Sequence, residues 1–355
     1  MLLVLLTESA LFFLIAAAVL AERPVALAAT GAAILAGLAA TRFVTPLRTA
    51  LRRAFERHHA TALVGGAAGA LALLYVTIVQ GLNFHIGTAG VLNLAGAAFE
   101  GLGGYTVGLL TVSAGWPSWL AVLVGPLAAV TVGAVLFVPI LKTRGHYLAL
   151  VTIAFVFIFN ILMNNLEFTG GPQGIKNIPT LQVAGYPFTT KPTVFGIGLP
   201  AHANFYYAAL LMAALTTWII RRLYDSWLGL ALNTLRDDEI AAKCCGISIT
   251  RGKLVAFSIG NFFIGLGGAF YAVMVGFVSP PDFDFGYSLV MLSVIIIGGV
   301  DSIPGVILGA FLLVLLPERF RFLQEYRLLL YGVVIVVMLL YRPQGLWPAA
   351  VRRYR

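Results

Sequence analysis

Residues 235–253, LRDDEIAAKCCGISITRGK, form the most polar run in a chain that is otherwise nearly all apolar. Long apolar segments lie on both sides of this run. Charged side chains are costly to bury in hydrocarbon, so we expect this run to lie in water. A long, helix-forming polar loop of this kind is typical of a segment that a partner protein contacts. Its charged residues are Arg236, Asp237, Asp238, Glu239, Lys243, Arg251 and Lys253.

The composition excludes an ordinary soluble domain. The chain has 355 residues, of which 60% are hydrophobic and 10% charged, and its mean hydropathy is +0.95. Soluble domains carry about 25% charged residues. Several apolar segments approach or exceed the roughly 20 residues that a helical span needs, whereas a transmembrane barrel shows short alternating segments. The sequence therefore predicts an all-α polytopic membrane protein with about 10–11 transmembrane helices.

The net charge of +9 is better explained by membrane orientation than by nucleic-acid binding. Basic residues favour the cytoplasmic side, which places the loop 42–57 and the tail 349–355 in the cytoplasm. The apolar N-terminus lacks a basic region and a small-residue cleavage site, so we interpret it as a span. Cys244 and Cys245 are adjacent in the polar loop, and two cysteines are too few for a zinc site, so we expect reduced thiols.

The predicted spans follow one another with short connections, and two exceptions stand out. The stretch 167–204 is hydrophilic but carries little charge, and we expect it outside the cytoplasm. The apolar segment 81–112 is too long for one helix and is divided by glycines. The other predicted spans are residues 2–20, 24–40, 61–80, 119–141, 147–166, 205–220, 254–278, 287–300, 306–316 and 328–341.

The segment 81–112 is predicted to be a broken or re-entrant helix followed by a span. Its first thirty residues are GLNFHIGTAGVLNLAGAAFEGLGGYTVGLL, and such interrupted backbone is tolerated where it lines a cavity or packs inside protein. Single crossings throughout would place the basic loop 42–57 outside, against its charge. A double pass within 81–112 would reconcile the crossings with the charge.

The polar loop contains a recognisable spacing: EIAA, three further residues, then glycine, at positions 239–246. This spacing resembles the E-A-A-x3-G signature of ABC-importer permeases. Small alanines let a short helix enter a groove, acidic residues suit its N-terminus, and glycine can end it. The alternative is an ordinary charged loop between spans. The residues that we expect to couple to an ATPase are Arg236, Asp237, Asp238, Glu239, Ala241, Ala242 and Gly246.

The same loop contains a false phosphate-binding motif. Five residues separate Gly246 from Gly252-Lys253-Leu254, whereas a phosphate loop needs four, and Ser or Thr after the lysine. We therefore expect no cofactor in this chain, with ATP and Mg²⁺ on partner subunits. The sequence also shows no paired acid and base, nucleophile or metal cluster, so we do not expect an enzyme.

Residues 82–348 resemble the permease subunits of branched-chain amino-acid ABC importers, of the LivM-like type. Besides the polar loop, the stretches that carry the resemblance are LNLAGAAFEGLGGYTVGLL, RGHYLALVTIAFVFIFN, TGGPQGI, IIIGGVDSIPGVILGA and YRPQGLWP, in the family's order. The resemblance implies inward transport of branched-chain or other hydrophobic amino acids across the bacterial plasma membrane. The implied partners are a second permease subunit, two cytoplasmic ATPase subunits and an extracytoplasmic solute-binding protein.

The resemblance also suggests a division of the chain. Residues 1–60 hold two spans and the basic loop, 61–348 form the permease domain with its coupling loop at 223–253, and 349–355 form the tail. The chain departs from the family at residues 94–96, Phe157 and Asn160, near the presumed pathway. Urea, short amides and other small solutes therefore stay open as alternatives. A permease for sugars, or an ion-coupled secondary transporter with broken helices, also remains open.

A few polar residues and glycines are candidates for the solute path. Glu100 lies in a glycine-rich membrane segment, where a carboxylate is a candidate functional group, although it could equally sit at a re-entrant tip in water. Asn93 and Tyr105 could donate hydrogen bonds to a zwitterion. His85 has either a role or an interfacial position, and Glu8 has no evident partner. Tyr147, Gly170 and Gly171 complete the candidates, and the glycines could equally form a plain turn.

Two pairs of glycines four residues apart predict close helix packing rather than function. These pairs are Gly104 with Gly108, and Gly305 with Gly309. Small residues at this spacing let two helices approach each other closely in a membrane.

Overall fold

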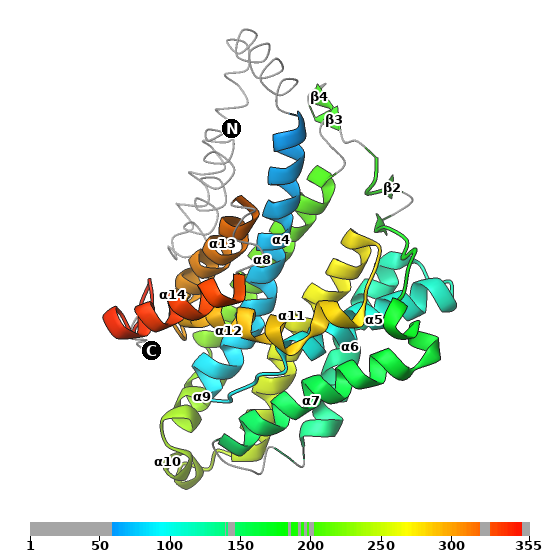
Figure 1. Ribbon diagram of the computed structural model, residues 1–355. Helices are drawn as coiled ribbons and strands as arrows, with labels where there is room; N and C mark the ends of the chain where they lie inside the picture. Colours follow the sequence, from blue (N-terminus) through cyan, green and yellow to red (C-terminus); the bar gives the residue numbers. More distant parts are fainter. Residues whose placement is uncertain are drawn as a thin grey trace.

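The computed structural model describes residues 59–138, 140, 146–183, 186–190, 193–194, 197–198, 202–319 and 327–349 (Figure 1). The predicted spans 2–20 and 24–40, Glu8 and the basic loop 42–57 lie outside these residues. The main helices are α4 His59–Asn83, α5 Gly96–Gly108, α6 Ser118–Phe137, α7 His146–Asn165, α8 His202–Tyr224, α9 Trp227–Asp237, α10 Glu239–Cys244, α11 Ile249–Val275, α12 Phe285–Gly298, α13 Ile303–Arg319 and α14 Arg327–Tyr341.

The remaining elements are short. Two π-helical turns extend α4 and α5, namely η2 Phe84–Thr88 and η3 Leu109–Ser113. The 3-10 turns are η5 Glu167–Thr169, η6 Gly171–Gln173 and η7 Pro280–Phe283. The strands are β1 Gln182–Val183, β2 Tyr186–Pro187, β3 Thr193–Val194 and β4 Ile197–Gly198. They pair as two antiparallel hairpins, with Gln182 opposite Pro187 and Thr193 opposite Gly198.

The all-α polytopic prediction is confirmed. Within the described residues, six helical segments are long and apolar enough to cross a membrane. Two shorter apolar helices, Ile303–Leu315 and Tyr331–Tyr341, and the 13-residue α5 occupy the places of the other predicted spans. The six are Ala67–Thr88, Ser118–Leu136, Tyr147–Asn165, Ala203–Tyr224, Ile249–Val275 and Pro280–Gly298.

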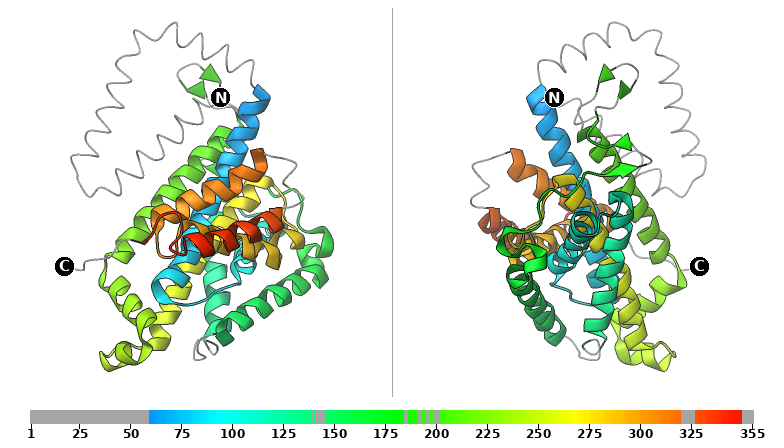
Figure 2. Two further views of the ribbon diagram at one scale, coloured as in Figure 1. Left: turned by 60° about the vertical axis from the view of Figure 1, so that its left-hand side comes forward. Right: turned by 90° about the vertical axis from the view of Figure 1, so that its right-hand side faces the viewer.

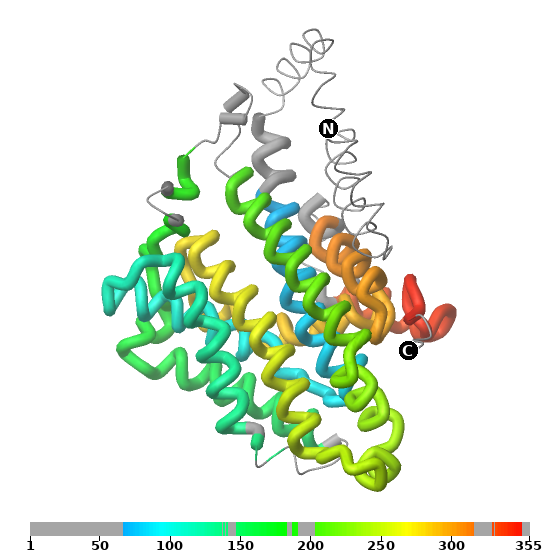
Figure 3. Tube along the Cα trace, turned by 180° about the vertical axis from the view of Figure 1, so that it is seen from behind, coloured from blue at the N-terminus to red at the C-terminus, as the bar shows by residue number. Residues whose placement is uncertain are grey.

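Two helices form the centre of the bundle. In the most apolar stretches of α4 and α11, 83% and 61% of the residues are buried, against 28–33% in those of α6, α7 and α8. α11 packs against α4, α5 and α6, while α4 also packs against α8 and α13. Figure 3 shows α8 in front of α4 and α11 beside them. The outer helices therefore present apolar side chains to lipid, as a membrane protein requires.

Glycine allows α5 and α11 to approach very closely. A Cβ atom added to Gly103 would overlap the carbonyl oxygen of Gly265, and one added to Gly268 would overlap that of Glu100. Gly104 faces the Gly268 carbonyl, where an added Cβ would lie 3.2 Å away. The helices thus touch backbone to backbone, a contact that only small residues permit.

Both predicted glycine pairs are confirmed as packing positions. A Cβ at Gly108 would lie 3.0 Å from Ile175 Cδ1. In α13, a Cβ at Gly305 would overlap the carbonyl oxygen of Gly298, and one at Gly309 would lie 2.6 Å from the carbonyl oxygen of Val294. The second pair therefore presses α13 against α12.

The predicted break in segment 81–112 is confirmed between η2 and α5. Residues 90–95 are non-helical, and Gly90 has a φ of +65°, which favours glycine. Side chains satisfy the exposed backbone here, since Thr152 Oγ1 accepts from Leu94 N at 3.1 Å and Ser288 Oγ accepts from Ala97 N at 3.1 Å. These contacts keep irregular backbone viable at membrane depth.

The double pass proposed for 81–112 is wrong. α4 begins at the end of the bundle opposite α10, and α6 ends at the α10 end (Figure 1). Between these two points the chain crosses the bundle in α4, α5 and α6. The break reverses the direction of the chain once, so residues 81–112 contribute one crossing and not two. The predicted placement of 167–204 opposite the polar loop agrees with Figure 2, where the strands and α10 lie at opposite ends.

Candidate coupling site and solute path

The polar loop folds into two helices with well-defined ends. Ser226 caps α9 by accepting from Gly229 N at 3.4 Å. Asp238 caps α10, since its Oδ1 accepts from the backbone N of Ile240 at 2.7 Å and of Ala241 at 3.1 Å. Gly246 follows α10 with a φ of +79°. The predicted helix start and stop are therefore present, and Asp238 acts on its own helix.

One ion pair attaches α10 to the central helix α11. Lys253 Nζ lies 2.7 Å from Glu239 Oε1, and the lysine side chain is 6% exposed. Ala242 is fully buried, whereas Ala241 is exposed. Of the two alanines in the predicted signature, only Ala242 packs within the chain. Glu239 therefore positions the short helix against α11.

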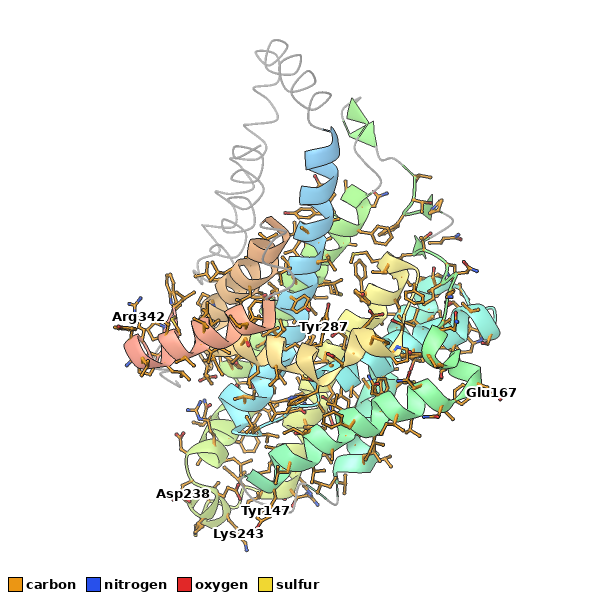
Figure 4. All side chains as sticks on the ribbon, viewed as in Figure 1. Tyr147, Glu167, Asp238, Lys243, Tyr287 and Arg342 are labelled. Carbon is orange, nitrogen blue, oxygen red and sulfur yellow. The ribbon has the colours of Figure 1, made fainter. Side chains whose placement is uncertain are left out.

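The outer face of α10 projects from the end of the bundle. Ile240 is 66% exposed although it is a large apolar residue. Lys243, Cys244 and Cys245 are exposed too, and both thiols are free. Figure 4 shows Asp238 and Lys243 at the tip of the bundle. The capped and anchored α10 therefore leaves the Ile240 side chain open to contact by another protein.

Arg236 joins the end of α9 to two distant parts of the chain. Its Nη1 donates to the carbonyl oxygen of Gly87 in η2, and lies 3.2 Å from Asp301 Oδ2 in the α12–α13 turn. Its Nε pairs with the exposed Asp237 at 3.1 Å. We call Arg236, Gly87 and Asp301 the Arg236 junction. It connects the polar loop to the helix break.

The Asp301 turn is held from three other sides. Its backbone N donates to Asn83 Oδ1 at 2.9 Å, and Thr88 Oγ1 donates to Asp301 Oδ1 at 3.4 Å. The C-terminal segment also reaches this turn, because Leu346 N donates to the carbonyl of Ile297 at 2.8 Å. Asp301 has a φ of +67°, in the left-handed region of the backbone.

His85 lies in the interior rather than at a membrane interface. It is fully buried and stacks on Phe257, with ring centroids 5.1 Å apart. Nε2 lies 3.0 Å from the Phe257 carbonyl oxygen, so it donates, and Nδ1 then accepts from Asn93 Nδ2 at 3.1 Å. Asn93 Oδ1 in turn accepts from Ala95 N at 2.9 Å. This chain of contacts holds the break against α11.

Glu100 and Tyr105 lie in α5, on the far side of the break from His85. Glu100 is 4% exposed and Tyr105 is 2% exposed. Glu100 Oε2 and the Tyr105 hydroxyl have no hydrogen-bond partner in the described part of the chain. Buried polar atoms normally have partners, so these two atoms are open to a water molecule or to a bound solute.

The other predicted path residues lie elsewhere. Tyr147 is 70% exposed at the α10 end (Figure 4). Gly170 and Gly171 have φ values of +79° and +53° and connect η5 with η6. A Cβ at Gly170 would overlap the carbonyl of Gly174, so the turn itself requires glycine. The structure does not bring these three beside Glu100, and their role in the path stays a prediction.

The positions that depart from the family are occupied by structural contacts. Asn160 Nδ2 donates to the carbonyl of Pro280 at 2.9 Å and so ties α7 to η7. Phe157 is 53% exposed and its ring lies 5.8 Å from that of Phe285. Among the described residues, no group of three or more His, Cys, Asp or Glu is suited to a metal ion.

Irregular backbone at membrane depth is tolerated where it packs inside protein or lines a cavity, and buried polar side chains surround this break. A broken helix of this kind is typical of membrane transport permeases. The chain belongs to the family described as the permease component of the branched-chain amino acid transport system, which matches residues 61–339. It is a multi-pass plasma-membrane protein, and the members of its family are transport permease subunits rather than enzymes.

Three proteins similar to this chain are themselves named as permeases. The high-affinity branched-chain amino acid transport system permease protein LivM of Escherichia coli is 38% identical, over 78% of this chain and 68% of the relative. A probable LivM of Methanocaldococcus jannaschii is 23% identical over 64% and 68%. A fructose import permease, FrcC of Rhizobium meliloti, is 24% identical over 70% and 69%. No solved structure matches the chain.

Proposed function

We propose that this chain is one permease subunit of an ABC importer that moves branched-chain or other hydrophobic amino acids inward. The observation that carries the coupling part is the geometry of α10. It is capped and anchored, yet presents an exposed Ile240, and the helix before it ends in the Arg236 junction. The amino-acid part is supported by the names of the relatives.

The proposed partners are a second permease subunit, two cytoplasmic ATPase subunits and an extracytoplasmic solute-binding protein. ATP and Mg²⁺ would bind the ATPase subunits, and this chain would hold no cofactor and carry out no covalent chemistry. Its coupling residues would act in two ways. Asp238, Glu239 and Gly246 shape α10, whereas Arg236 transmits its displacement.

The connection suggests how ATP binding would reach the solute path. A displacement of α10 moves α9, because only Asp238 separates the two helices. Arg236 then pulls on the carbonyl of Gly87 and on Asp301, which flank the break and the α12–α13 turn. Packed helices switch between discrete arrangements, so a small shift at one end can open the other.

Replacing the exposed isoleucine is expected to separate assembly from folding. In Ile240→Ser, uptake and ATPase co-purification should fall by about tenfold, because removing a buried apolar contact at an interface costs about 1.5–3 kcal/mol. The melting temperature of the isolated permease should not change, since Ile240 is 66% exposed. The check is pull-down of the ATPase together with thermal unfolding. Full ATPase retention by this variant would show that α10 is not the docking helix.

The whole proposal is tested by purification in mild detergent, with mass spectrometry of the bound proteins. We expect two ATPase chains and a second permease, followed by amino-acid-stimulated ATP hydrolysis when the solute-binding protein is added. If urea, a short amide or fructose stimulates ATP hydrolysis and amino acids do not, the transported solute belongs to that class instead. A protein that purifies alone and transports on an ion gradient would overturn the importer assignment.

A further inference from the structure

The environment of Glu100 has a distinct chemical character. Glu100 lies in α5, which packs against η7, α4 and α11, the elements that carry Asp282, Tyr75 and Tyr271. These groups come from α5, η7, α4 and α11, which are separate parts of the chain. The ion pairs of Arg236 and Lys253 with Asp237, Asp301 and Glu239 do not involve Glu100.

Asp282 is placed by its own turn. Its Oδ2 accepts from the backbone N of Ser279 at 2.9 Å and from Ser279 Oγ at 2.7 Å. The turn η7 packs against α5 and α7, and Asn160 holds it through the carbonyl of Pro280. The carboxylate is therefore held at the contact of η7 with α5, the helix that carries Glu100.

Aromatic rings form the rest of the surroundings. The Tyr105 ring lies 6.1 Å from Phe159 and 6.0 Å from Phe283, and Tyr271 lies 6.2 Å from Phe283. Tyr75 lies 6.2 Å from Tyr287, which Figure 4 shows in the middle of the molecule. Ring faces attract cations, and phenyl groups pack against apolar chains.

Without a positive partner a carboxyl group in such surroundings holds a proton, and a bound cation lets it ionise and pair, since burying a charge alone is very costly. Glu100 Oε2 and the Tyr105 hydroxyl are two of the buried polar atoms without a hydrogen-bond partner in the described residues, and both can accept a hydrogen bond. An ammonium group supplies one positive charge and three N–H donors. Two carboxylates and tyrosines suit it better than a divalent metal, for which the described residues offer no larger ligand group.

We infer that Glu100, with Asp282 and the tyrosines around it, forms a subsite for the primary ammonium group of the transported solute, and that Phe159 and Phe283 contact its apolar side chain. This inference rests on the proposed function and adds the chemical feature that the permease itself selects. Urea, short amides and fructose lack an ammonium group. The subsite therefore distinguishes amino acids from these alternative solutes.

The test is direct binding of L-leucine and of its deaminated hydroxy acid to the purified permease–ATPase complex, without the solute-binding protein. In Glu100→Gln, L-leucine should bind about tenfold to a hundredfold more weakly, because a charge-assisted hydrogen bond contributes about 1.5–3 kcal/mol. Binding of the hydroxy acid, which has no ammonium group, should change little. Glu100→Asp retains the charge and should keep part of the affinity.

Asp225→Asn is the matched control, because it also removes one carboxylate but lies exposed between α8 and α9. It should bind both solutes as the wild type does. If the wild type binds L-leucine and Glu100→Gln binds it equally well, the ammonium subsite is wrong while the importer stands. If the wild-type complex binds no amino acid, the proposed solute class is wrong, and the ammonium subsite is wrong with it. Loss in Glu100→Gln of uptake driven by a proton gradient, without ATP, would assign the carboxylate to proton binding instead.

Discussion

Gly268→Ala is expected to destabilise the permease by about 3 kcal/mol, at the upper end of overpacking effects. A methyl group at this position would overlap the carbonyl oxygen of Glu100 and lie 2.9 Å from its Cγ. The obstacle is the backbone of α5 rather than the end of a flexible side chain. The helices α5 and α11 would have to separate, and this displacement would also open the neighbouring contact of Gly103 with Gly265.

The melting temperature in detergent measures this effect, and the yield of monodisperse protein is a second measure. The control is Gly332→Ala in α14, because a Cβ there meets nothing within 4 Å. That variant should have the same melting temperature as the wild type. An unchanged melting temperature for Gly268→Ala would mean that the close contact between α5 and α11 is absent in the folded protein.

Arg236→Ala is expected to leave ATP hydrolysis in place while uptake falls by about tenfold or more. The substitution removes the donor to the Gly87 carbonyl and the partner of Asp301, whose side chain is 12% exposed. Hydrogen bonds to charged groups contribute about 1.5–3 kcal/mol each. Displacement of α10 would then no longer reach the break, so the ratio of solute moved to ATP hydrolysed should drop.

Proteoliposome uptake and ATPase activity, measured together, test this uncoupling. Arg251→Ala is the control, since it removes an exposed positive charge near the same end of the bundle and should keep the wild-type ratio. Asp301→Asn should have a smaller effect, because Arg236 still donates to Gly87. Exchanging the charges of Arg236 and Asp301 should not restore uptake, because an aspartate cannot donate to that carbonyl. If the exchanged variant recovers full uptake, the ion pair alone couples α9 to the turn, and the hydrogen bond to Gly87 has no role.

The sequence alone determined the class of protein and the local form of its polar loop. Spans were predictable because lipid requires long apolar helices, whose length and composition are properties of contiguous residues. The start of α10 at Asp238 and its end near Gly246 follow from capping, which is also local. The break after Gly81 was predictable for the same reason, since glycine spacing is visible without any partner.

Only the tertiary structure decided what the polar residues do. Arg236 meets Gly87 across 149 residues and Asp301 across 65, and neither separation leaves a periodic signal. His85 proved to be a buried link to α11 because Gly260 leaves room for its ring. Glu100 acquired its acidic and aromatic surroundings from four separate elements. Such contacts depend on how helices pack, and packing is a property of the whole bundle rather than of any one stretch.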